Sequence, residues 1–257
     1  MPILGINDKC INCGQCISEC PTRNFKLDEK QDQTIFSKTQ CILCGHCIAI
    51  CPTDAIIYEG MMDVAIDFKE LNSFPSPESL YKLIRSKRSV RRYQNKLVPD
   101  EIIKKIIESI RYAPTAINIR SIKCILISGK EKIEEFADKI IDSLESEKEK
   151  SGLKKLREKG LIPFFYDAPH ILILHSNNGW VEINATIAIT YAMLYAETLG
   201  IGSCWIGGIQ RLFAGNKEIS KKVIGNSNKV GGIMIFGYPA VEYKRAPPRP
   251  PVDLKKM

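Results

Sequence analysis

The 257-residue sequence predicts an α+β protein with a small cysteine-rich N-terminal domain and a larger domain in which helices cover a sheet. Three observations predict this fold class. Two cysteine runs of equal spacing occupy the first sixty residues. In the rest of the chain, apolar runs of strand length are separated by helical patterns, which is typical of a layered α/β domain. The proline-rich segment 75–77 separates the two parts.

The cysteines follow the spacing C-x-x-C-x-x-C-x-x-x-C-P twice, in residues 10–21 and 41–52. This spacing is typical of proteins that hold two [4Fe-4S] clusters, because three thiolates of a run bind one cluster and the fourth reaches the other. Gly14 and Gly45 lie where a Cβ would crowd the cluster. The expected ligands are Cys10, Cys13, Cys16 and Cys51 for one cluster, and Cys41, Cys44, Cys47 and Cys20 for the other. The sequence therefore predicts electron transfer.

A disulfide scaffold and a pair of zinc sites are the alternatives for such a segment. Zinc sites usually combine two separated C-x-x-C knuckles and have no use for a run ending in Cys-Pro. No secretory hydrophobic segment precedes the first run, so we expect a reducing cytoplasm. The two remaining cysteines, Cys124 and Cys204, are expected to pack as small hydrophobic residues.

Composition excludes several classes of protein. No apolar run approaches the ~20 residues of a spanning helix, and 44% hydrophobic residues is ordinary for a globular chain. We therefore expect a soluble protein without a membrane partner. A net charge of +8 is compatible with binding to nucleic acid, but the lysines alternate with glutamates, as in residues 145–159. Such runs are usually solvated helix faces, so we expect no nucleic-acid partner.

The start of the second domain carries two helix signals. Residues 61–76 are expected to form a linker, after which Ser76, Pro77 and Glu78 give the cap, first position and first turn of a helix. A second helix is predicted from Pro99, because isoleucines between residues 102 and 110 place a wide apolar stripe on one face.

The remaining elements alternate between strands and helices. Strands are predicted at 122–128, 171–174 and 230–236, where apolar and β-branched residues form short runs. A charged helical stretch is predicted from residue 131 to 159, with a break at Gly152.

A long apolar helix is expected from Ala185 to Leu199, stopped by Gly200 in a left-handed conformation and buried in the core or at a subunit interface. The proline-rich tail 239–251 should run extended over a surface. No G-x-G-x-x-G motif follows a strand, so a Rossmann nicotinamide-binding unit is not supported.

Residues 87–93 concentrate four cations and a serine hydroxyl, a combination suited to a phosphate monoester. A solvated basic turn is the alternative. Three further segments bear on the choice: the turn 113–118, the glycine-rich segment 200–208, and Gly237-Tyr-Pro-Ala240 followed by Arg249.

In this order and spacing, the four segments resemble the nitroreductase family of FMN-dependent oxidoreductases, in the subgroup with a preceding ferredoxin-type domain. The resemblance covers essentially the whole chain. It implies a ferredoxin-like bis-cluster domain at residues 1–60, a linker at 61–76 and a nitroreductase-like α/β sandwich domain at 77–257. It also implies FMN as a cofactor and a homodimer.

The resemblance implies a role for each segment. Lys87, Arg88, Ser89 and Arg91 would hold the FMN phosphate and ribityl chain, although Lys87 stands where Arg is usual. In the dimer, a turn would contact the flavin from the neighbouring subunit through Pro114, Thr115, Ala116 and Asn118. Ile206, Gly207 and Gly208 would lie along the flavin ring, and Arg249 would bind the phosphate, with Lys244 and Arg245 as rivals. The family often continues Ser-Gln-Pro-Trp after its Asn, whereas Ile119 follows Asn118 here, which leaves the shape of the substrate pocket open.

The implied reaction passes electrons through two clusters to FMN and on to a nitroaromatic, a quinone or an activated alkene. The alternatives are a flavin reductase or dehydrogenase driven by NAD(P)H, and a non-enzymatic electron carrier or redox sensor; ferredoxin and NAD(P)H are the candidate donors. No catalytic acid or base is assigned, because the chemistry belongs mainly to the cofactor. The tryptophans and histidines are expected to be structural: Trp180, Trp205, His46, His170 and His175.

Overall fold

The computed structural model describes residues 3–37, 40–60, 63, 65–68, 74–213 and 216–257. The chain divides into two compact units, Met1–Phe74 with Ile117–Ile119 and Pro75–Ala116 with Arg120–Met257. Much of the expected linker, residues 61–62, 64 and 69–73, lies outside the described residues.

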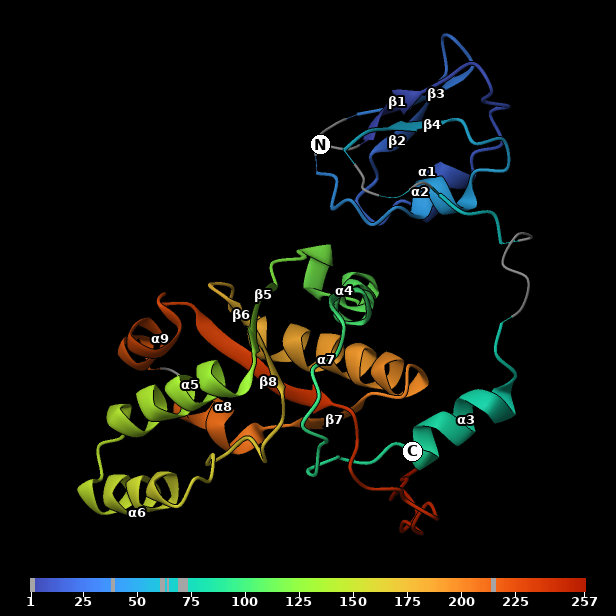
Figure 1. Ribbon diagram of the computed structural model, residues 1–257. Coiled ribbons are helices and arrows are strands. Elements are labelled where there is room, and N and C mark those ends of the chain that lie inside the picture. The colour runs from blue at the N-terminus through green and yellow to red at the C-terminus, as the bar shows by residue number, and fades with distance from the viewer. Residues whose placement is uncertain (1–2, 38–39, 61–62, 64, 69–73, 214–215) are drawn as a thin grey trace. The chain divides into compact units, whose positions relative to one another are not determined.

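The first unit is built from two antiparallel strand pairs and two short helices (Figure 1). The strands pair antiparallel, β1 (Ile3–Ile6) with β4 (Ile56–Tyr58) and β2 (Phe25–Asp28) with β3 (Gln33–Phe36). The helices are α1 (Gln15–Glu19) and α2 (His46–Ile50). A small core of four buried residues holds the layers together: Ile3, Phe25, Cys47 and Ile56.

The backbone of the first unit repeats itself, as the cysteine spacing does. Three positions of the first loop have a left-handed conformation, and each has a counterpart at the same place in the second loop. These pairs are Asn12 and Leu43, Gly14 and Gly45, and Arg23 and Asp54. Gly14 and Gly45 are the residues just before α1 and α2, where this conformation favours glycine.

The second unit contains a four-stranded sheet in the order β5-β6-β8-β7. Its strands are β5 (Lys123–Ser128), β6 (His170–Ser176), β7 (Gly202–Trp205) and β8 (Lys229–Gly237). All neighbouring strands are antiparallel. The three predicted strands are confirmed, and β7 is an additional strand within the glycine-rich segment.

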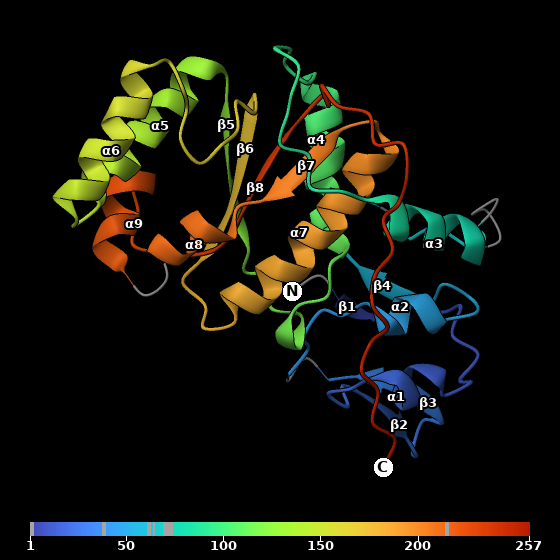
Figure 2. The same ribbon diagram turned by 90° about the horizontal axis from the view of Figure 1, so that it is seen from below.

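Helices cover both faces of this sheet (Figures 1 and 2). Ile171 and Ile173 of β6 pack on one side against α5 (Lys130–Ser143), α8 (Gly207–Phe213) and α9 (Lys217–Ile224). Leu172 and Leu174 pack on the other side against α4 (Asp100–Ser109) and α7 (Val181–Thr198). Because successive side chains of a strand point to opposite faces of the sheet, β6 contributes residues to the cores on both sides.

The predicted helix starts are confirmed. In α3 (Pro77–Ser86), Ser76 Oγ accepts a hydrogen bond from the Ser79 backbone N–H, and Pro77 takes the first position. Helix α4 begins directly after Pro99.

Helix α7 starts at Val181, four residues before the expected start. Gly200 has a φ of 72°, and a Schellman pair of hydrogen bonds closes the helix, from Gly200 N to Glu197 O and from Ile201 N to Ala196 O.

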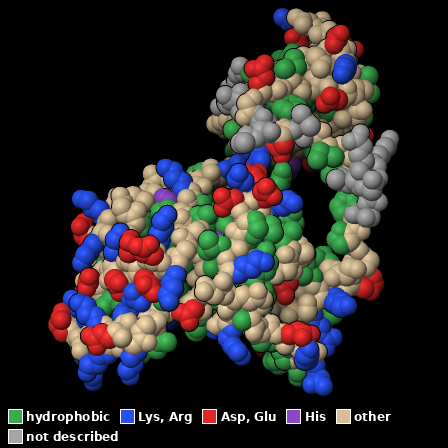
Figure 3. All heavy atoms as spheres, in the orientation of Figure 1, with side chains coloured by type: hydrophobic (Ala, Val, Ile, Leu, Met, Phe, Trp, Pro, Cys, Tyr) green, Lys and Arg blue, Asp and Glu red, His purple; other side chains and the backbone are tan. Residues whose placement is uncertain are grey.

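The predicted break at Gly152 in the charged stretch 131–159 is wrong. The stretch forms α5 and α6 (Glu147–Glu158), and the break lies between them, where Ser146 Oγ caps α6 by accepting from Glu149 N. Gly152 lies inside α6, because an isolated glycine weakens a helix without ending it. Figure 3 shows side chains of both charges interleaved over α5 and α6. Among the residues that the structure describes, no helix is long and apolar enough to cross a membrane.

Two smaller expectations differ in outcome. Cys204 is buried, as expected, whereas Cys124, on the edge strand β5, is exposed. Beyond the bridge between Tyr93 and Pro239, residues 241–257 contain no helix or strand, as their prolines predicted.

Candidate functional site

The eight cysteines of the two runs surround two cavities in the first unit. Cys10, Cys13, Cys16 and Cys51 line one cavity. Cys20, Cys41, Cys44 and Cys47 line the other. The structure therefore brings together the two quartets expected from the spacing, and each quartet takes its fourth thiol from the opposite run.

The short helices explain this exchange. Cys16 lies in the first turn of α1 and Cys20 directly follows its end, so the two are separated by about 6 Å along the helix axis. The same relation holds for Cys47 and Cys51 around α2. Because α1 and α2 pack together, the end of each helix reaches the cavity beside the start of the other.

The electrostatics of the thiols reflect the same grouping. Burial raises the pKa of Cys16, and the neighbouring thiols Cys10, Cys13 and Cys51 raise it further. Burial also raises the pKa of Cys47 to about 11, with further contributions from Cys44, Cys41 and Cys20. Clustered thiolates repel one another, so a bound positive centre would relieve an unfavourable arrangement.

The fourth thiol of each quartet is also hydrogen-bonded. The backbone N–H of Asn24 donates to Cys20 Sγ and that of Ala55 donates to Cys51 Sγ, each at 3.2 Å. Burial alone would raise the pKa of these two thiols, but hydrogen bonds to their sulfurs outweigh it and lower the pKa of both. Such donors stabilise the thiolate that a metal ligand must be.

The arrangement of each quartet fits a cluster. Within the described residues, no three His, Cys, Asp or Glu side chains come close enough together to hold one metal ion. The thiols are instead spaced around a cavity, with N–H donors to sulfur and left-handed glycines at its edge. Four cysteine thiolates around one cavity are the ligand set of a [4Fe-4S] cube.

The second unit contains a cavity of about 810 Å³. This volume lies in the range of small-molecule and cofactor sites, which are mostly apolar with a few polar groups. The cavity is lined from α6, from the segment 164–166, from β7 and from α8, and by one arginine, Arg91. Of the residues expected at the flavin, four line this cavity: Arg91, Ile206, Gly207 and Gly208.

The lining has one cation, Arg91, one carboxylate, Glu149, and several flat or small side chains. The Arg91 guanidinium lies 5.8 Å from the centre of the Tyr166 ring, within range of a cation–π contact. A Cβ at Gly208 would meet nothing within 4 Å, so the backbone there is accessible. Trp205 Nε1 donates to Gln210 Oε1 at 3.0 Å, which fixes the indole at the cavity wall. These groups suit a planar ligand with an anionic or carbonyl edge.

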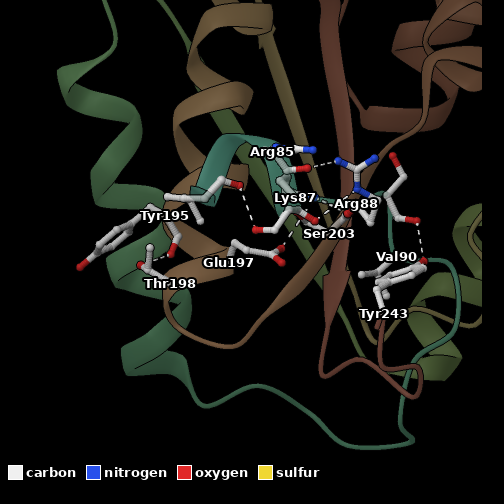
Figure 4. Close-up of polar contacts among 12 residues, drawn as sticks. Arg85, Lys87, Arg88, Val90, Tyr195, Glu197, Thr198, Ser203 and Tyr243 are labelled. Atoms are coloured by element: carbon white, nitrogen blue, oxygen red, sulfur yellow. Dashed lines mark hydrogen bonds and ion pairs between the residues drawn. The ribbon is translucent and has the colours of Figure 1, made fainter. Parts of the chain in front are cut away.

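Lys87 is placed differently from the expectation (Figure 4). Its Nζ donates to the backbone carbonyls of Arg88 at 2.6 Å and Ser203 at 3.1 Å, and lies 4.0 Å from Glu197 Oε2. Its side chain is only 10% exposed. Burial lowers the pKa of Lys87 and raises that of Glu197, while the attraction between the two opposes both shifts. Lys87 therefore ties the basic segment to β7 and does not line the cavity.

The next residues of the basic segment contact the end of α3 and the strand β7. Arg88 donates to the backbone carbonyls of Ser86 and Arg85. Ser89 forms a parallel bridge with Ser203. A Cβ at Gly202 would lie 2.7 Å from Val90 Cγ2, so glycine permits the close approach of this segment to β7.

The turn after α4 is held from α7. The Ala116 backbone N–H donates to Asn184 Oδ1 at 3.1 Å, and the Arg120 N–H donates to Thr115 Oγ1 at 3.1 Å. Asn118 has a left-handed backbone, with a φ of 54°. The residues that line the 810 Å³ cavity do not include this turn, from Pro114 to Asn118.

The candidate phosphate cations at the C-terminus are exposed. Arg249 and Arg245 lie in the extended tail, and Lys244 Nζ forms an ion pair of 2.5 Å with Glu242. The structure therefore leaves Arg249 and Arg245 accessible to a ligand.

Sequence reasoning missed the aromatic wall of the cavity. Phe164 and Tyr166 line it and have left-handed backbones, with φ values of 75° and 52°. A non-glycine residue in this conformation is uncommon and is often found at functional sites. The aromatic run 164–166 was the available signal, but an aromatic run alone does not distinguish a cavity wall from a core.

Comparisons with known proteins agree with both units. Residues 84–238 match the model of the nitroreductase family, and residues 9–55 match that of the 4Fe-4S dicluster domain. A curated protein of Methanothermobacter thermautotrophicus, described as a candidate NADH dehydrogenase/NAD(P)H nitroreductase, is 26% identical over 181 residues, 64% of this chain and 80% of the relative. A relative of the same description from Archaeoglobus fulgidus is 25% identical over 130 residues, 51% of this chain and 68% of its own.

Solved structures show the same fold for the second unit. A nitroreductase from Bacteroides fragilis with bound FMN superposes with a TM-score of 0.56 at 24% identity, over 69% of this chain and 98% of that one. A nitroreductase with bound FMN from Desulfitobacterium hafniense gives a TM-score of 0.51 at 23% identity, over 67% and 94% of the two chains.

Proposed function

The chain belongs to the nitroreductase family, and from that premise we propose that it is an FMN-dependent oxidoreductase served by two [4Fe-4S] clusters. In this proposal, electrons pass from the clusters to FMN and on to an electrophilic organic acceptor. Nitroaromatics, quinones and activated alkenes are the acceptor classes we propose.

One observation carries the proposal: the same chain has two cavities each lined by four cysteines and, in its nitroreductase fold, an 810 Å³ cavity that Arg91 faces. The two cysteine-lined cavities suit [4Fe-4S] clusters, which carry one electron at a time. FMN supplies the exchange of either one or two electrons, which links such carriers to two-electron acceptors.

We propose that Ile206, Gly207 and Gly208, which line the cavity, lie along the flavin ring. Arg91 was expected at the phosphate and ribityl chain, but it lines the same cavity, so we propose that it contacts the ring instead. A guanidinium at the edge of the cavity stabilises negative charge on a bound ligand, and Phe164 and Tyr166 exclude water from one wall. The phosphate is assigned to Arg88, Ser89 and Arg249. Lys87 contributes by positioning the basic segment on β7, because its Nζ is already bound to carbonyls.

We also propose a homodimer in which the turn of Pro114, Thr115, Ala116 and Asn118 contacts the flavin of the partner. Exposed apolar residues on α7, among them Ile183 and Tyr191, support an interface on this helix. Thiolate ligands need a reducing compartment, so the proposed location is the cytoplasm.

A second candidate concerns the electron donor. The two curated relatives are described as candidate NADH dehydrogenases as well as NAD(P)H nitroreductases, which favours NAD(P)H as a donor for this chain too. In that case the clusters would receive electrons from the flavin site.

The test is a visible spectrum of protein purified without oxygen, followed by reduction with either reduced ferredoxin or NAD(P)H. We expect flavin and iron-sulfur absorption together, and bleaching by one of the two donors. Protein that contains iron and sulfide but no flavin would contradict the enzyme and favour an electron carrier. Reduction by NAD(P)H alone would support the second candidate.

A further inference from the structure

The two thiol-lined cavities differ in one respect that the cysteine spacing does not show. Cys20 and Cys51 hold equivalent places, each followed by proline and threonine, and each threonine hydroxyl lies 3.8 Å from its cysteine sulfur. Thr22 lines the cavity of Cys20 and Thr53 lines that of Cys51. Two residues after each threonine, the loops differ: Asn24 stands in one and Ala55 in the other.

Asn24 fixes the direction of the Thr22 hydroxyl. Asn24 Oδ1 accepts a hydrogen bond from the Gln40 backbone N–H at 3.1 Å, and this backbone group can only donate. The amide nitrogen must therefore face the other way, and Asn24 Nδ2 donates to Thr22 Oγ1 at 2.6 Å. Asn24 is fully buried, so solvent does not compete with these bonds.

The Thr22 hydroxyl can therefore act as a hydrogen-bond donor toward Cys20. Its oxygen already accepts from Asn24, and its single hydrogen is available for donation. Cys20 Sγ is the neighbouring acceptor, and a cysteine that binds a cluster is a thiolate that can only accept. At Cys51 the backbone N–H of Ala55 also donates to sulfur, but a methyl side chain cannot orient Thr53.

We propose that Thr22 and Asn24 act as a pair to raise the reduction potential of the cluster held by Cys20, Cys41, Cys44 and Cys47. This inference rests on the proposed function, since it requires the clusters to be present. Reduction adds one electron to the cluster and makes its thiolates more negative. An oriented donor stabilises that reduced form more than the oxidised form, and hydrogen bonds to sulfur are among the groups that set cluster potentials.

The experiment is an anaerobic redox titration of the full-length protein with dithionite, followed by electron paramagnetic resonance, with iron and sulfide analysis of every variant. In Thr22→Val the equilibrium constant for reduction of one cluster should fall by about fivefold. At 59 mV per decade for one electron, the midpoint potential of that cluster should therefore fall by about 40 mV. Thr22→Ser, which keeps the hydroxyl, should retain the original midpoint.

Matched variants test the role of Asn24. Asn24→Ala gives the site of Cys20 the alanine that Ala55 supplies at the site of Cys51, while the backbone N–H bond to Cys20 remains. The Thr22 hydroxyl is then no longer oriented, so the midpoint potential that falls in Thr22→Val should fall here too. The double variant Thr22→Val with Asn24→Ala should fall less than the sum of the two single shifts, because the residues act together. Thr53→Val should lower the other midpoint, and by a smaller amount.

Three results would overturn the inference. They are an unchanged midpoint in Thr22→Val with full iron content, equal shifts in Thr22→Val and Thr53→Val, and additive shifts in the double variant. If Thr22→Val loses iron, Asn24→Ala and Thr22→Ser decide the question, since both keep a hydroxyl beside Cys20. A wild-type protein without cluster signals would overturn the proposed function, and the inference with it. Normal wild-type signals with unmoved variant midpoints would overturn the inference alone.

Discussion

Asn184, inside α7, accepts a hydrogen bond through its side-chain Oδ1 from the backbone N–H of Ala116, 3.1 Å away. Asn184 is fully buried, and this bond joins the long central helix to the turn that follows α4. The turn is the segment proposed to reach the flavin of a partner subunit, so its conformation depends on a residue far along the chain.

The first prediction removes this anchor. Asn184→Ala should lower the free energy of unfolding by about 1 to 3 kcal/mol, because the partly buried Ala116 N–H loses its hydrogen-bond partner. Urea denaturation followed by circular dichroism measures the change. Glu182→Ala, at an exposed position two residues earlier in the same helix, serves as the control and should be near neutral. Equal stability of the two variants would contradict the anchoring role.

The second prediction concerns the contact between β8 and α7. A Cβ at Gly231 would lie 2.5 Å from Val181 O and 2.7 Å from Ala185 Cβ, so the helix and strand would have to separate. Gly231→Ala should destabilise the protein by about 1 to 3 kcal/mol. Gly179→Ala, where a Cβ meets nothing within 4 Å, is the matched control. A thermal unfolding scan that gives the same midpoint for both would refute this account of the packing.

The third prediction concerns acid stability. Burial lowers the pKa of His170 to about 4 from its usual 6.5, opposed only by Asp100. Its Nε2 accepts the Val98 backbone N–H at 2.9 Å, an acceptor role that a protonated ring cannot keep. Below pH 6.5 the unfolded chain binds a proton here that the folded chain refuses, so stability falls as the pH drops toward 4.

The size of this effect is at most about 3 kcal/mol. Denaturation measured at several pH values should show the loss between pH 6.5 and 4, and His170→Gln should flatten the slope. His175, whose pKa burial also lowers, remains in that variant and should account for the residual slope. An unchanged slope would show that His170 is not responsible.

The fourth prediction tests the cavity. Arg91→Ala should lower flavin retention by roughly tenfold or more, as expected for a lost charge-assisted hydrogen bond. Iron and sulfide content should stay unchanged, because Arg91 belongs to the other unit. Arg88→Ala should also lose flavin, whereas Arg91→Lys keeps a charge and should retain more than Arg91→Ala. If Arg91→Ala and Arg88→Ala both retain full flavin, the proposed contacts of these arginines with the flavin ring and the phosphate are wrong.

The fifth prediction addresses assembly. Ile183, Tyr191 and Tyr195 on α7 are large apolar or aromatic side chains, yet they are 55%, 42% and 39% exposed. Light scattering at micromolar concentration should give a dimer, and Ile183→Asp should weaken it. Glu182→Lys, which changes the charge of its exposed neighbour, controls for charge alone. A wild-type monomer that still binds FMN would contradict the shared site.

Local signals in the sequence were sufficient for much of the fold. Ser76 and Pro77 gave a helix start, and Gly200 gave a helix end, because caps depend on residues next to them. The break in the charged stretch also had a local signal. Ser146 with Glu149 three residues later is a capping pattern that marks the start of α6, whereas Gly152 lies inside that helix.

Long-range partners could not be read from the sequence. Lys87 was expected at a phosphate, but its carbonyl partner on Ser203 lies 116 residues away, and Glu197 is equally remote. The wall formed by Phe164 and Tyr166 depends on backbone angles that aromatic residues seldom adopt. The pairing of the cysteines is the exception, because the spacing of each run already fixes which thiols can reach one cube.

Because Cys20 completes the cavity of the second loop and Cys51 that of the first, neither loop is a self-sufficient unit. A graft of one loop into a foreign scaffold would transfer three thiols of one site and a lone thiol of its neighbour. Deleting one half would likewise leave both sites incomplete. The two halves must therefore be inherited, exchanged or engineered together, even though their backbones repeat each other.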